Sequence, residues 1–428
     1  MLPASTKEQA SGVSGLPASS GPGPTYGLPL RELRGVICRS VRRACVDSFG
    51  GHLEAIVLTG SLARDEATYE RIANSHRILG DAEFLLVFQK HENPPQAAEL
   101  SDLRRRIEEE LLRRLVTCKV DLSAVRANYF QGLPAHIFSY ELKHCGYIIW
   151  GDADVLRAIP EFSTADLSRE DAARLLSNRF VEVLECAPEL FSGQNAKTPA
   201  VQYKLLKMCL DAGTSLLVFL GRYAPTYRER SEILSRLAFA AVDEIGLPFN
   251  LKSFAALVAE CTNWKVNPPE SRGAAPILTW PEVALLAHAL WRWEMIQLTR
   301  APETSTDADL FRAWNRSQSW KTRMLGWARI ARSSGWRARR RHCLRWLKLC
   351  RVAGPRLAVY QAAFGVLFDS SAPSGAHSPH GKARDVYSLR NLLPVTEVAP
   401  SAIASGDRLT LAQEILLNYR EFLIATRL

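Results

Sequence analysis

The chain lacks any hydrophobic run long enough to cross a membrane. A membrane-spanning helix needs ~18 consecutive apolar residues, and no window of the sequence reaches that length. The first residues, rich in Ser, Gly and Pro, have neither the basic start nor the apolar stretch of a secretory signal. These absences favour a cytoplasmic protein without a transmembrane segment, and they leave binding to a membrane surface open.

Several motifs of familiar enzyme classes are also missing. The sequence contains no Walker loop, no Rossmann glycine pattern, no recognisable nucleophilic triad and no repeat at a fixed period. Its nine cysteines include no CxxC pair, and most of them lie in apolar segments. We therefore expect reduced, buried thiols rather than a disulfide framework.

The composition that remains is that of a folded protein with a basic balance. At 428 residues the chain has room for two or three domains of about 150 residues each. Hydrophobic residues make up 47% and charged residues 23%, as in ordinary globular proteins. Lys and Arg number 54 against 44 Asp and Glu, so nucleotides, nucleic acid and acidic lipids are favoured as partners.

Hydrophobic periodicity predicts an α/β arrangement in the first third of the chain. Apolar residues at helical spacing predict helices at 30–49 and 100–115. Short β-branched runs predict strands at 54–59, 82–88, 118–125 and 147–150. Because the helix at 100–115 lies between two strands, we expect it to cross over from one strand to the next within the same sheet.

Helical patterns take over after residue 160. They predict helices at 168–186, 201–220, 229–244, 281–298 and 411–426. The fold class is therefore α+β, with an N-terminal mixed-sheet domain followed by a mainly α-helical domain. We expect these boundaries: a disordered tail at 1–28, the sheet domain at 29–160, a helical substrate-side domain at 161–302, a Trp- and Arg-rich helical region at 303–369, a flexible loop at 370–384 and a C-terminal helical segment at 385–428.

Three acidic residues of the predicted sheet form a candidate metal site. Asp81 and Glu83 lie two residues apart at the start of the second strand, and a period of two places them on the same face. Asp121 lies in the third strand and can add another oxygen ligand. Such hard oxygen ligands suit Mg²⁺ or Mn²⁺.

A glycine-serine turn follows the first predicted strand. Gly60 and Ser61 precede the segment LARDEATYERI, which reads as a helix, so their backbone N–H groups and the hydroxyl can bind a polyphosphate. Arg64 fits either a phosphate contact or a structural ion pair. Lys204 and Lys207, one helical interval apart, fit either phosphate contacts from the second domain or a solvated helix face.

The order strand-GS, acidic pair, later lone Asp resembles the DNA polymerase β-type nucleotidyltransferase superfamily, especially its small bacterial and aminoglycoside-modifying members. The resemblance covers about residues 50–126, on the strings VLTGSLAR and LGDAEFLLVF. Two departures are the nineteen residues between Ser61 and Asp81, and the Asp65 that follows Arg64 where many members have Gly. The helical segment that begins VQYKLLKMCLDAG also resembles the partner domain of the aminoglycoside enzymes.

This resemblance implies roles for the candidate residues. Asp81, Glu83 and Asp121 would be the catalytic, metal-binding residues, and Asp121 would also help to deprotonate the acceptor hydroxyl. Gly60, Ser61, Arg64 and Lys204 would bind the nucleotide.

The implied reaction is the metal-dependent transfer of a nucleoside monophosphate, AMP from ATP or its equivalent from another nucleoside triphosphate, to a hydroxyl of a small molecule. Two alternatives stay open: an enzyme that modifies protein or RNA, and a catalytically silent nucleotide-binding scaffold. The segment 336–351 (WRARRRHCLRWLKLCR) is a basic amphipathic helix that fits RNA, an acidic membrane or an acidic protein. A packed surface helix with solvated arginines fits it as well.

Overall fold

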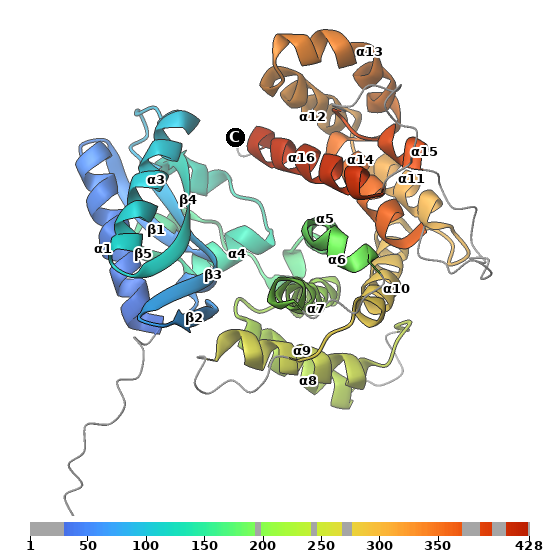
Figure 1. Cartoon of the computed structure of the whole chain (residues 1–428), viewed down its shortest axis with the longest axis horizontal. Helices are drawn as coiled ribbons and strands as arrows, with labels where there is room; N and C mark the ends of the chain where they lie inside the picture. Colours follow the sequence, from blue (N-terminus) through green and yellow to red (C-terminus); the bar gives the residue numbers. More distant parts are fainter. Residues whose placement is uncertain are drawn as a thin grey trace, which may run out of the picture.

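A computed structural model of the chain describes residues 30–192, 198–240, 246–267, 276–369, 386–395 and 408–426. The tail at 1–28 and the loop at 370–384 that the sequence predicts both lie outside these residues. Figure 1 shows a sheet region at the amino-terminal end of the described chain and an extended helical region beyond it. The mixed α+β composition expected from the sequence is therefore confirmed at this coarse level.

The sheet is organised around one long central strand, β3 (Ser75–Phe88). Along one edge, β3 pairs in parallel with β4 (Val116–Arg126). Along its other edge, it pairs antiparallel with β2 (Tyr69–Ile72) near its start and with β1 (Leu53–Thr59) near its end. A short strand, β5 (Tyr147–Gly151), pairs antiparallel with β1. The sheet is thus mixed, as predicted.

Two helices cover one face of this sheet. Helices α1 (Leu30–Phe49) and α3 (Ala97–Arg113) each present an apolar stripe to it. These stripes and the alternate side chains of the strands form one continuous buried cluster. The burial of that cluster explains the alternation along β4, where every second residue up to Leu122 faces inward.

The other face of the sheet is covered over only part of its area. Ala55, Val57, Leu85 and Val87 on this face pack against helix α4 (Ile137–Cys145) and the short helices η1 (Ala127–Gly132) and η2 (Val155–Ala158). This cover lies at the end of β3 that carries Leu85 and Val87. The preceding residues of the same face of β3 are acidic.

From residue 169 onward, every described element is a helix. The first group is α5 (Arg169–Val183), η4 (Leu184–Cys186), α6 (Ala187–Phe191), α7 (Pro199–Phe219), α8 (Tyr227–Ala240), α9 (Leu251–Val266) and α10 (Trp280–Thr299). The second is α11 (Asp307–Ser317), α12 (Trp320–Ser333), α13 (Trp336–Val352), α14 (Pro355–Phe364), η5 (Gly365–Asp369), α15 (Val386–Arg390) and α16 (Arg408–Thr426).

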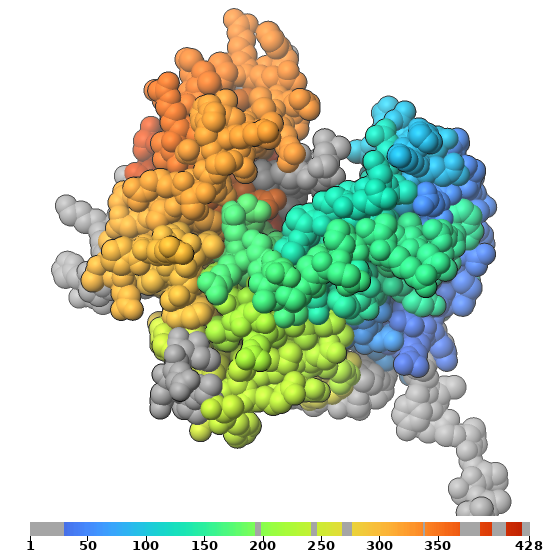
Figure 2. Space-filling view, turned by 180° about the vertical axis from the view of Figure 1, so that it is seen from behind, coloured from blue at the N-terminus to red at the C-terminus, as the bar shows by residue number. Residues whose placement is uncertain are grey.

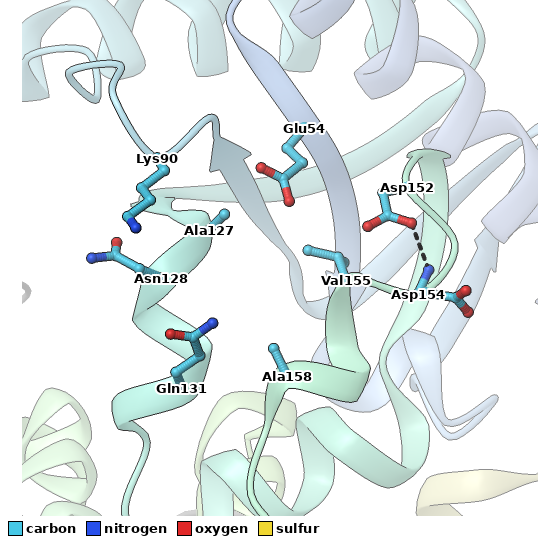
Figure 3. A pocket seen from close by; sticks show the side chains of 9 residues that line it. All are labelled: Glu54, Lys90, Ala127, Asn128, Gln131, Asp152, Asp154, Val155 and Ala158. Atoms are coloured by element: carbon cyan, nitrogen blue, oxygen red, sulfur yellow. Dashed lines mark hydrogen bonds between the residues drawn. The ribbon is translucent and has the colours of Figure 1, made fainter.

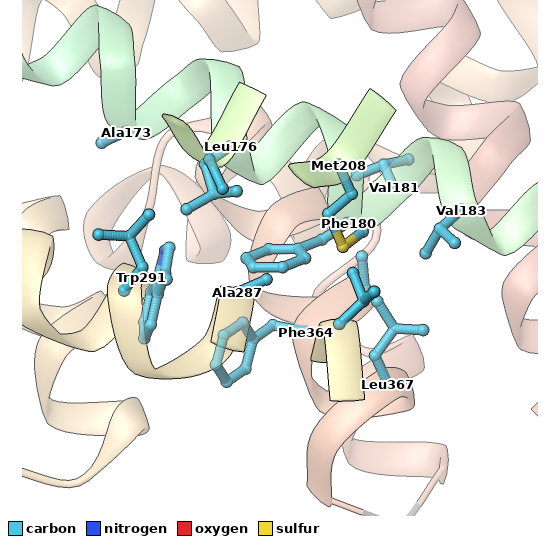
Figure 4. Packing of buried hydrophobic residues seen from close by; sticks show 14 of the residues in the cluster. Ala173, Leu176, Phe180, Val181, Val183, Met208, Ala287, Trp291, Phe364 and Leu367 are labelled. Carbon is cyan, nitrogen blue, oxygen red and sulfur yellow. The ribbon is translucent and has the colours of Figure 1, made fainter. Parts of the chain in front are cut away.

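One large apolar core joins these helices. It runs from α5 and α7 through α10 to α14 and α16, and Figure 4 shows Phe180, Trp291 and Phe364 packed against one another at its centre. The ring of Trp291 lies 4.3 Å from that of Phe364, centroid to centroid. Because segments far apart in sequence share this core, the predicted regions 161–302 and 303–369 pack together.

Several local predictions need correction. The segment after Gly60 forms only a single helical turn, α2 (Gly60–Ala63), and residues 69–72 form a strand instead of continuing the predicted helix. The strand predicted at 82–88 begins earlier, at Ser75, so residues 79–81 also lie within β3. Helices α9 and α14 lie within the predicted helical regions 161–302 and 303–369, but neither was predicted as an individual helix. Within the described part of the chain, no helix is long and apolar enough to cross a bilayer.

Candidate active site

Strand pairing brings the three predicted acidic residues to one face of the sheet. In the parallel register of β3 and β4, Glu83 lies directly beside Asp121, and Asp81 lies beside Lys119. Asp81 and Glu83 are two residues apart on β3, so their side chains point to the same side. This is the face that α4 covers only in part, and both side chains are exposed while Asp121 is half-buried.

The glycine-serine turn leaves the sheet at the level of this acidic pair. Thr59, the last residue of β1, pairs with Glu83 of β3. After the loop, the chain enters β2, whose first residue, Tyr69, pairs with Ile78 of β3. The intervening loop 60–68 therefore passes the stretch of β3 that carries Asp81 and Glu83.

Gly60 allows the turn to lie directly against the Glu83 carboxylate. Its φ of +68° is unfavourable for residues with a side chain, and a Cβ there would lie 2.8 Å from Glu83 Oε2. Only glycine therefore fits without displacing the carboxylate. The turn and the acidic pair, predicted separately from the sequence, are in direct contact.

Crowding by other carboxylates distinguishes Glu83 from an ordinary surface acid. The Glu83 side chain forms part of the wall of a recess. Solvent reaches this side chain from one side, and protein surrounds it on the others. The resulting loss of hydration is the largest cause that raises its pKa above the usual value of 4.5. The positive charge of Arg64 opposes this shift, whereas the negative charges of Asp121, Glu141 and Asp81 raise the pKa further.

The recess is small. Thr59, Gly60 and Glu83 line it from the sheet side, and Arg64 and residues of α4, among them Glu141, close it from the other. Its volume of about 30 Å³ suffices for an ion or one or two water molecules. Asp81, Glu83 and Asp121 together mark what we call the acidic face of the sheet. A nucleotide would have to lie outside the recess, across the exposed part of this face.

Arg64 is engaged in a buried ion-pair network rather than directed into solvent. Its guanidinium bonds Glu141 Oε2 at 2.5 Å and approaches Glu66 Oε2 at 3.4 Å, and its side chain is only 6% exposed. Of the two readings of Arg64 from the sequence, the structure places it in the structural ion pair. Glu141 also binds Arg230 and accepts a hydrogen bond from the Tyr223 hydroxyl.

This network fixes the helical region against the sheet domain. The carboxylate of Glu66 accepts hydrogen bonds from the backbone N–H groups of Tyr227 and Arg228 at the start of α8, at 2.9 and 3.1 Å. A negative charge at that helix end is also favoured by the helix dipole. Thr68 donates a hydrogen bond to the carbonyl of Lys265 on α9. The loop that carries the glycine-serine turn is therefore held by the helical region.

Helix α7 contributes basic residues near the acidic face, but Lys204 is already neutralised. Its ammonium lies 2.7 Å from a Glu185 oxygen and 3.9 Å from one of Glu182. Lys207, one turn further along, has different surroundings. The positive charge of Arg179 and burial lower its pKa, and Lys265 contributes in the same direction.

The position of Lys207 relative to β3 follows from its neighbour Tyr203. The Tyr203 hydroxyl lies 4.0 Å from the site of a Cβ on Gly80, the residue before Asp81. The Lys207 ammonium lies 5.9 Å from the centre of the Tyr203 ring. Tyr203 therefore lies beside the residue that precedes Asp81, and Lys207 lies beside Tyr203. The sequence pattern of α7 pointed to Lys204 and Lys207 together and did not distinguish them.

The acidic residues fit a divalent cation in chemical type. All three are carboxylates, and mutual repulsion raises the pKa of Glu83, so a cation would relieve an existing electrostatic cost. Within the described residues, however, no three Asp, Glu, His or Cys side chains lie close enough to form a ready-made metal site. Side-chain rotation would have to complete the ligand set.

A second, larger pocket lies at the opposite end of the sheet. Its volume is about 310 Å³, and Figure 3 shows it between the start of β1, the end of β3 and the short helices η1 and η2. Glu54, Asp152 and Asp154 line one side, and Lys90 and Asn128 the other. Its carboxylates provide an internal comparison for the acidic face, since they belong to the same domain but lie far from Gly60.

No protein-family model matches the chain, and no curated protein is significantly similar to it.

Proposed function

We propose that this protein is a metal-dependent nucleotidyltransferase of the polymerase β type, which transfers a nucleoside monophosphate to a hydroxyl group. The observation that carries the proposal is the pairing register that sets Asp121 beside Glu83, with Asp81 on the same face and Gly60 against the Glu83 carboxylate. Carboxylates of adjacent strands next to a backbone turn combine cation ligands with anion-binding N–H groups.

Asp81, Glu83 and Asp121 are the residues that would hold Mg²⁺ or Mn²⁺. When bound, the metal would neutralise charge on the triphosphate and on the leaving pyrophosphate. Asp121 would accept the proton of the attacking hydroxyl, because its half-buried carboxylate lies beside the metal-binding pair. Gly60 and Ser61 would donate to phosphate oxygens. Because α2 is a single turn, this contact relies on local N–H groups and the hydroxyl rather than on a long helix dipole.

Lys207 supports a polyphosphate substrate better than Lys204 does. The positive charge of Arg179, burial and the positive charge of Lys265 lower the Lys207 pKa, although Glu182 opposes them and Arg179 is itself paired with Glu182 and Asp211. An anion bound at Lys207 would offset its positive charge, whereas Lys204 is already paired with Glu185. We therefore assign the phosphate contact from the helical region to Lys207, and Lys204 a structural role on α7.

Incubation with labelled ATP, CTP, GTP or UTP, Mg²⁺ or Mn²⁺ and pools of small hydroxyl compounds tests this function. We expect label transfer from one or more of these nucleotides, and its loss in a variant with Asp81→Asn and Glu83→Gln. The matched control is Asp152→Asn with Asp154→Asn, which removes two carboxylates at the far end of the same sheet. Transfer that survives the first pair of changes would contradict the proposal.

A catalytically silent nucleotide-binding scaffold is the second candidate. The absence of a ready-made three-ligand metal group in the described part of the chain favours it. It predicts nucleotide binding that needs Lys207 but no label transfer to any acceptor, protein and RNA included. Equilibrium binding of each nucleotide, measured with and without Mg²⁺, separates this candidate from the enzyme.

A further inference from the structure

The positive charge of this protein is concentrated in one segment. Residues 310–368 contain 14 Lys and Arg and no Asp or Glu. The rest of the chain therefore holds 40 basic and 44 acidic residues and is slightly acidic. The net charge of +10 arises entirely from the segment that contains α12 and α13.

These two helices form a hairpin whose inner side is packed. Trp327 and Ile330 of α12 meet Trp346 and Cys350 of α13 in a small apolar cluster. The indole N–H of Trp346 donates to the carbonyl of Pro394 at 2.7 Å. The orientation of α13 is thereby fixed. Figure 1 shows the hairpin at the outer end of the helical region, and Figure 2 shows this part of the chain as a protruding lobe.

The outward face of α13 combines exposed cations with exposed large apolar residues. Arg340, Leu344, Leu347 and Arg351 recur at intervals of three and four residues, so they share one face of the helix. Leu344 is 73% exposed and Leu347 58% exposed, although both lie among arginines. Trp336, at the start of the helix, is 73% exposed.

A binding partner of this face has to interact with both its arginines and its apolar side chains. Phosphates of a nucleic acid would use the arginines but leave Leu344 and Leu347 without a role. An anionic bilayer would attract the arginines to its headgroups and bury the leucines and Trp336 at the acyl boundary. The positive charge of residues 310–368, which contain no acid, explains why the protein would be attracted to an anionic bilayer. The exposed apolar side chains of α13 explain why it would stay bound there.

We propose that the outward face of α13 docks this protein on anionic lipid membranes. The sheet domain lies away from this lobe (Figure 1), so docking would leave the acidic face uncovered by the bilayer. This inference does not depend on nucleotidyl transfer, and it concerns residues that the proposed reaction does not use.

The test is sedimentation of the full chain with phosphatidylcholine vesicles that contain or lack phosphatidylserine. We expect binding only to vesicles with phosphatidylserine, weakened by added salt. Each basic residue at such a surface contributes roughly fivefold to affinity, so Arg340→Gln with Arg351→Gln should weaken binding roughly 25-fold. Leu344→Ser with Leu347→Ser should weaken it by more than about tenfold, through lost apolar burial.

Matched controls come from equally exposed residues elsewhere. Arg106→Gln with Arg113→Gln on α3, and Leu112→Ser with Leu285→Ser, should leave vesicle binding unchanged. All altered side chains are exposed, and far-ultraviolet circular dichroism checks that each variant is folded.

Two results would overturn the proposal. One is the absence of binding to phosphatidylserine vesicles. The other is binding that the leucine changes leave intact, because simple charge attraction would then suffice. Arginine-dependent binding to a single-stranded RNA oligonucleotide, without vesicle binding, would assign the face to nucleic acid instead.

Discussion

Glu83 of the sheet domain and Glu294 of the helical core both have a raised pKa, but for different reasons. At Glu294 the cause is burial alone, which raises its pKa to about 8 against a smaller opposing effect of Ser215. At Glu83, burial acts together with three neighbouring carboxylates. Glu294 is completely enclosed by apolar helices, whereas Glu83 faces a recess.

The comparison shows which observation indicates a functional site. A shifted pKa marks any acid that has lost water, including one in a dry core. Crowding of like charges at a solvent-accessible surface is more specific, because it persists only where the fold holds the charges together. Substitutions at Asp121, Glu141, Gly60 and Glu294 separate the two kinds of acid experimentally.

Replacement of Asp121 by Asn should have the largest effect. If Asp121 accepts the proton of the acceptor hydroxyl, kcat for label transfer should fall by ~10²–10⁴-fold, with a much smaller change in KM for the nucleotide. Steady-state kinetics of transfer measures both constants. A decrease below about tenfold would assign Asp121 to structure rather than to catalysis.

Replacement of Glu141 by Gln should break the junction between the two regions. It leaves Arg64 and Arg230 without their shared carboxylate in a buried position, which should lower the free energy of unfolding by about 3–5 kcal/mol. Urea denaturation measures the loss. Glu109→Gln, on the exposed side of α3, is the control and should change stability by less than about 1 kcal/mol. Equal effects of the two changes would contradict the assigned role of the network.

Replacement of Gly60 by Ala should affect both stability and activity. The positive φ alone costs about 1–3 kcal/mol. Gly246→Ala measures this cost by itself, since Gly246 has a φ of +63° and no atom of the described residues lies within 4 Å of the position of a Cβ there. Gly60→Ala should exceed that control, because its methyl group must also displace the Glu83 carboxylate. Thermal unfolding and label transfer of both variants check this, and similar values would show that the contact with Glu83 is unimportant.

Replacement of Glu294 by Gln should change the pH dependence of stability. Between its unfolded pKa of 4.5 and its folded pKa of about 8, the folded protein keeps a proton that the unfolded chain has released. Stability is therefore lost as the pH rises through this window, by up to about 1.4 kcal/mol per pH unit from this residue. Denaturation at several pH values should show a shallower slope in the variant. An unchanged slope would mean that Glu294 is ionised in the core.

Much of the sheet domain could be predicted because its signals are local. The helix at 30–49 and the strand ending at Thr59 were predicted closely, since their apolar residues face a single core. The segment after Gly60 was predicted wrongly, because the pairing of residues 69–72 with β3 depends on a non-local partner. Asn250 precedes helix α9, and its side chain accepts a hydrogen bond from the Ser253 N–H, so the sequence does carry a capping signal for this helix.

The sequence predicted that the three acidic residues lie on one face of the sheet, but it did not predict their surroundings. A period of two sufficed to place Asp81 and Glu83 together, and pairing between the strands then set Asp121 beside Glu83. The ion pairs of Arg64 with Glu141 and the approach of Tyr203 to Gly80 join residues far apart in sequence. Such contacts depend on how the helical region docks, which no local pattern encodes.

Binding of Mn²⁺ to the purified protein shows whether Asp81 and Glu83 belong to a metal site. Electron paramagnetic resonance should show saturable loss of the free Mn²⁺ signal in the unaltered protein and in the Asp152→Asn, Asp154→Asn control. The same titration of the Asp81→Asn, Glu83→Gln variant should show that this binding is lost. Equal binding in all three proteins would contradict the assignment of the acidic face as a metal site.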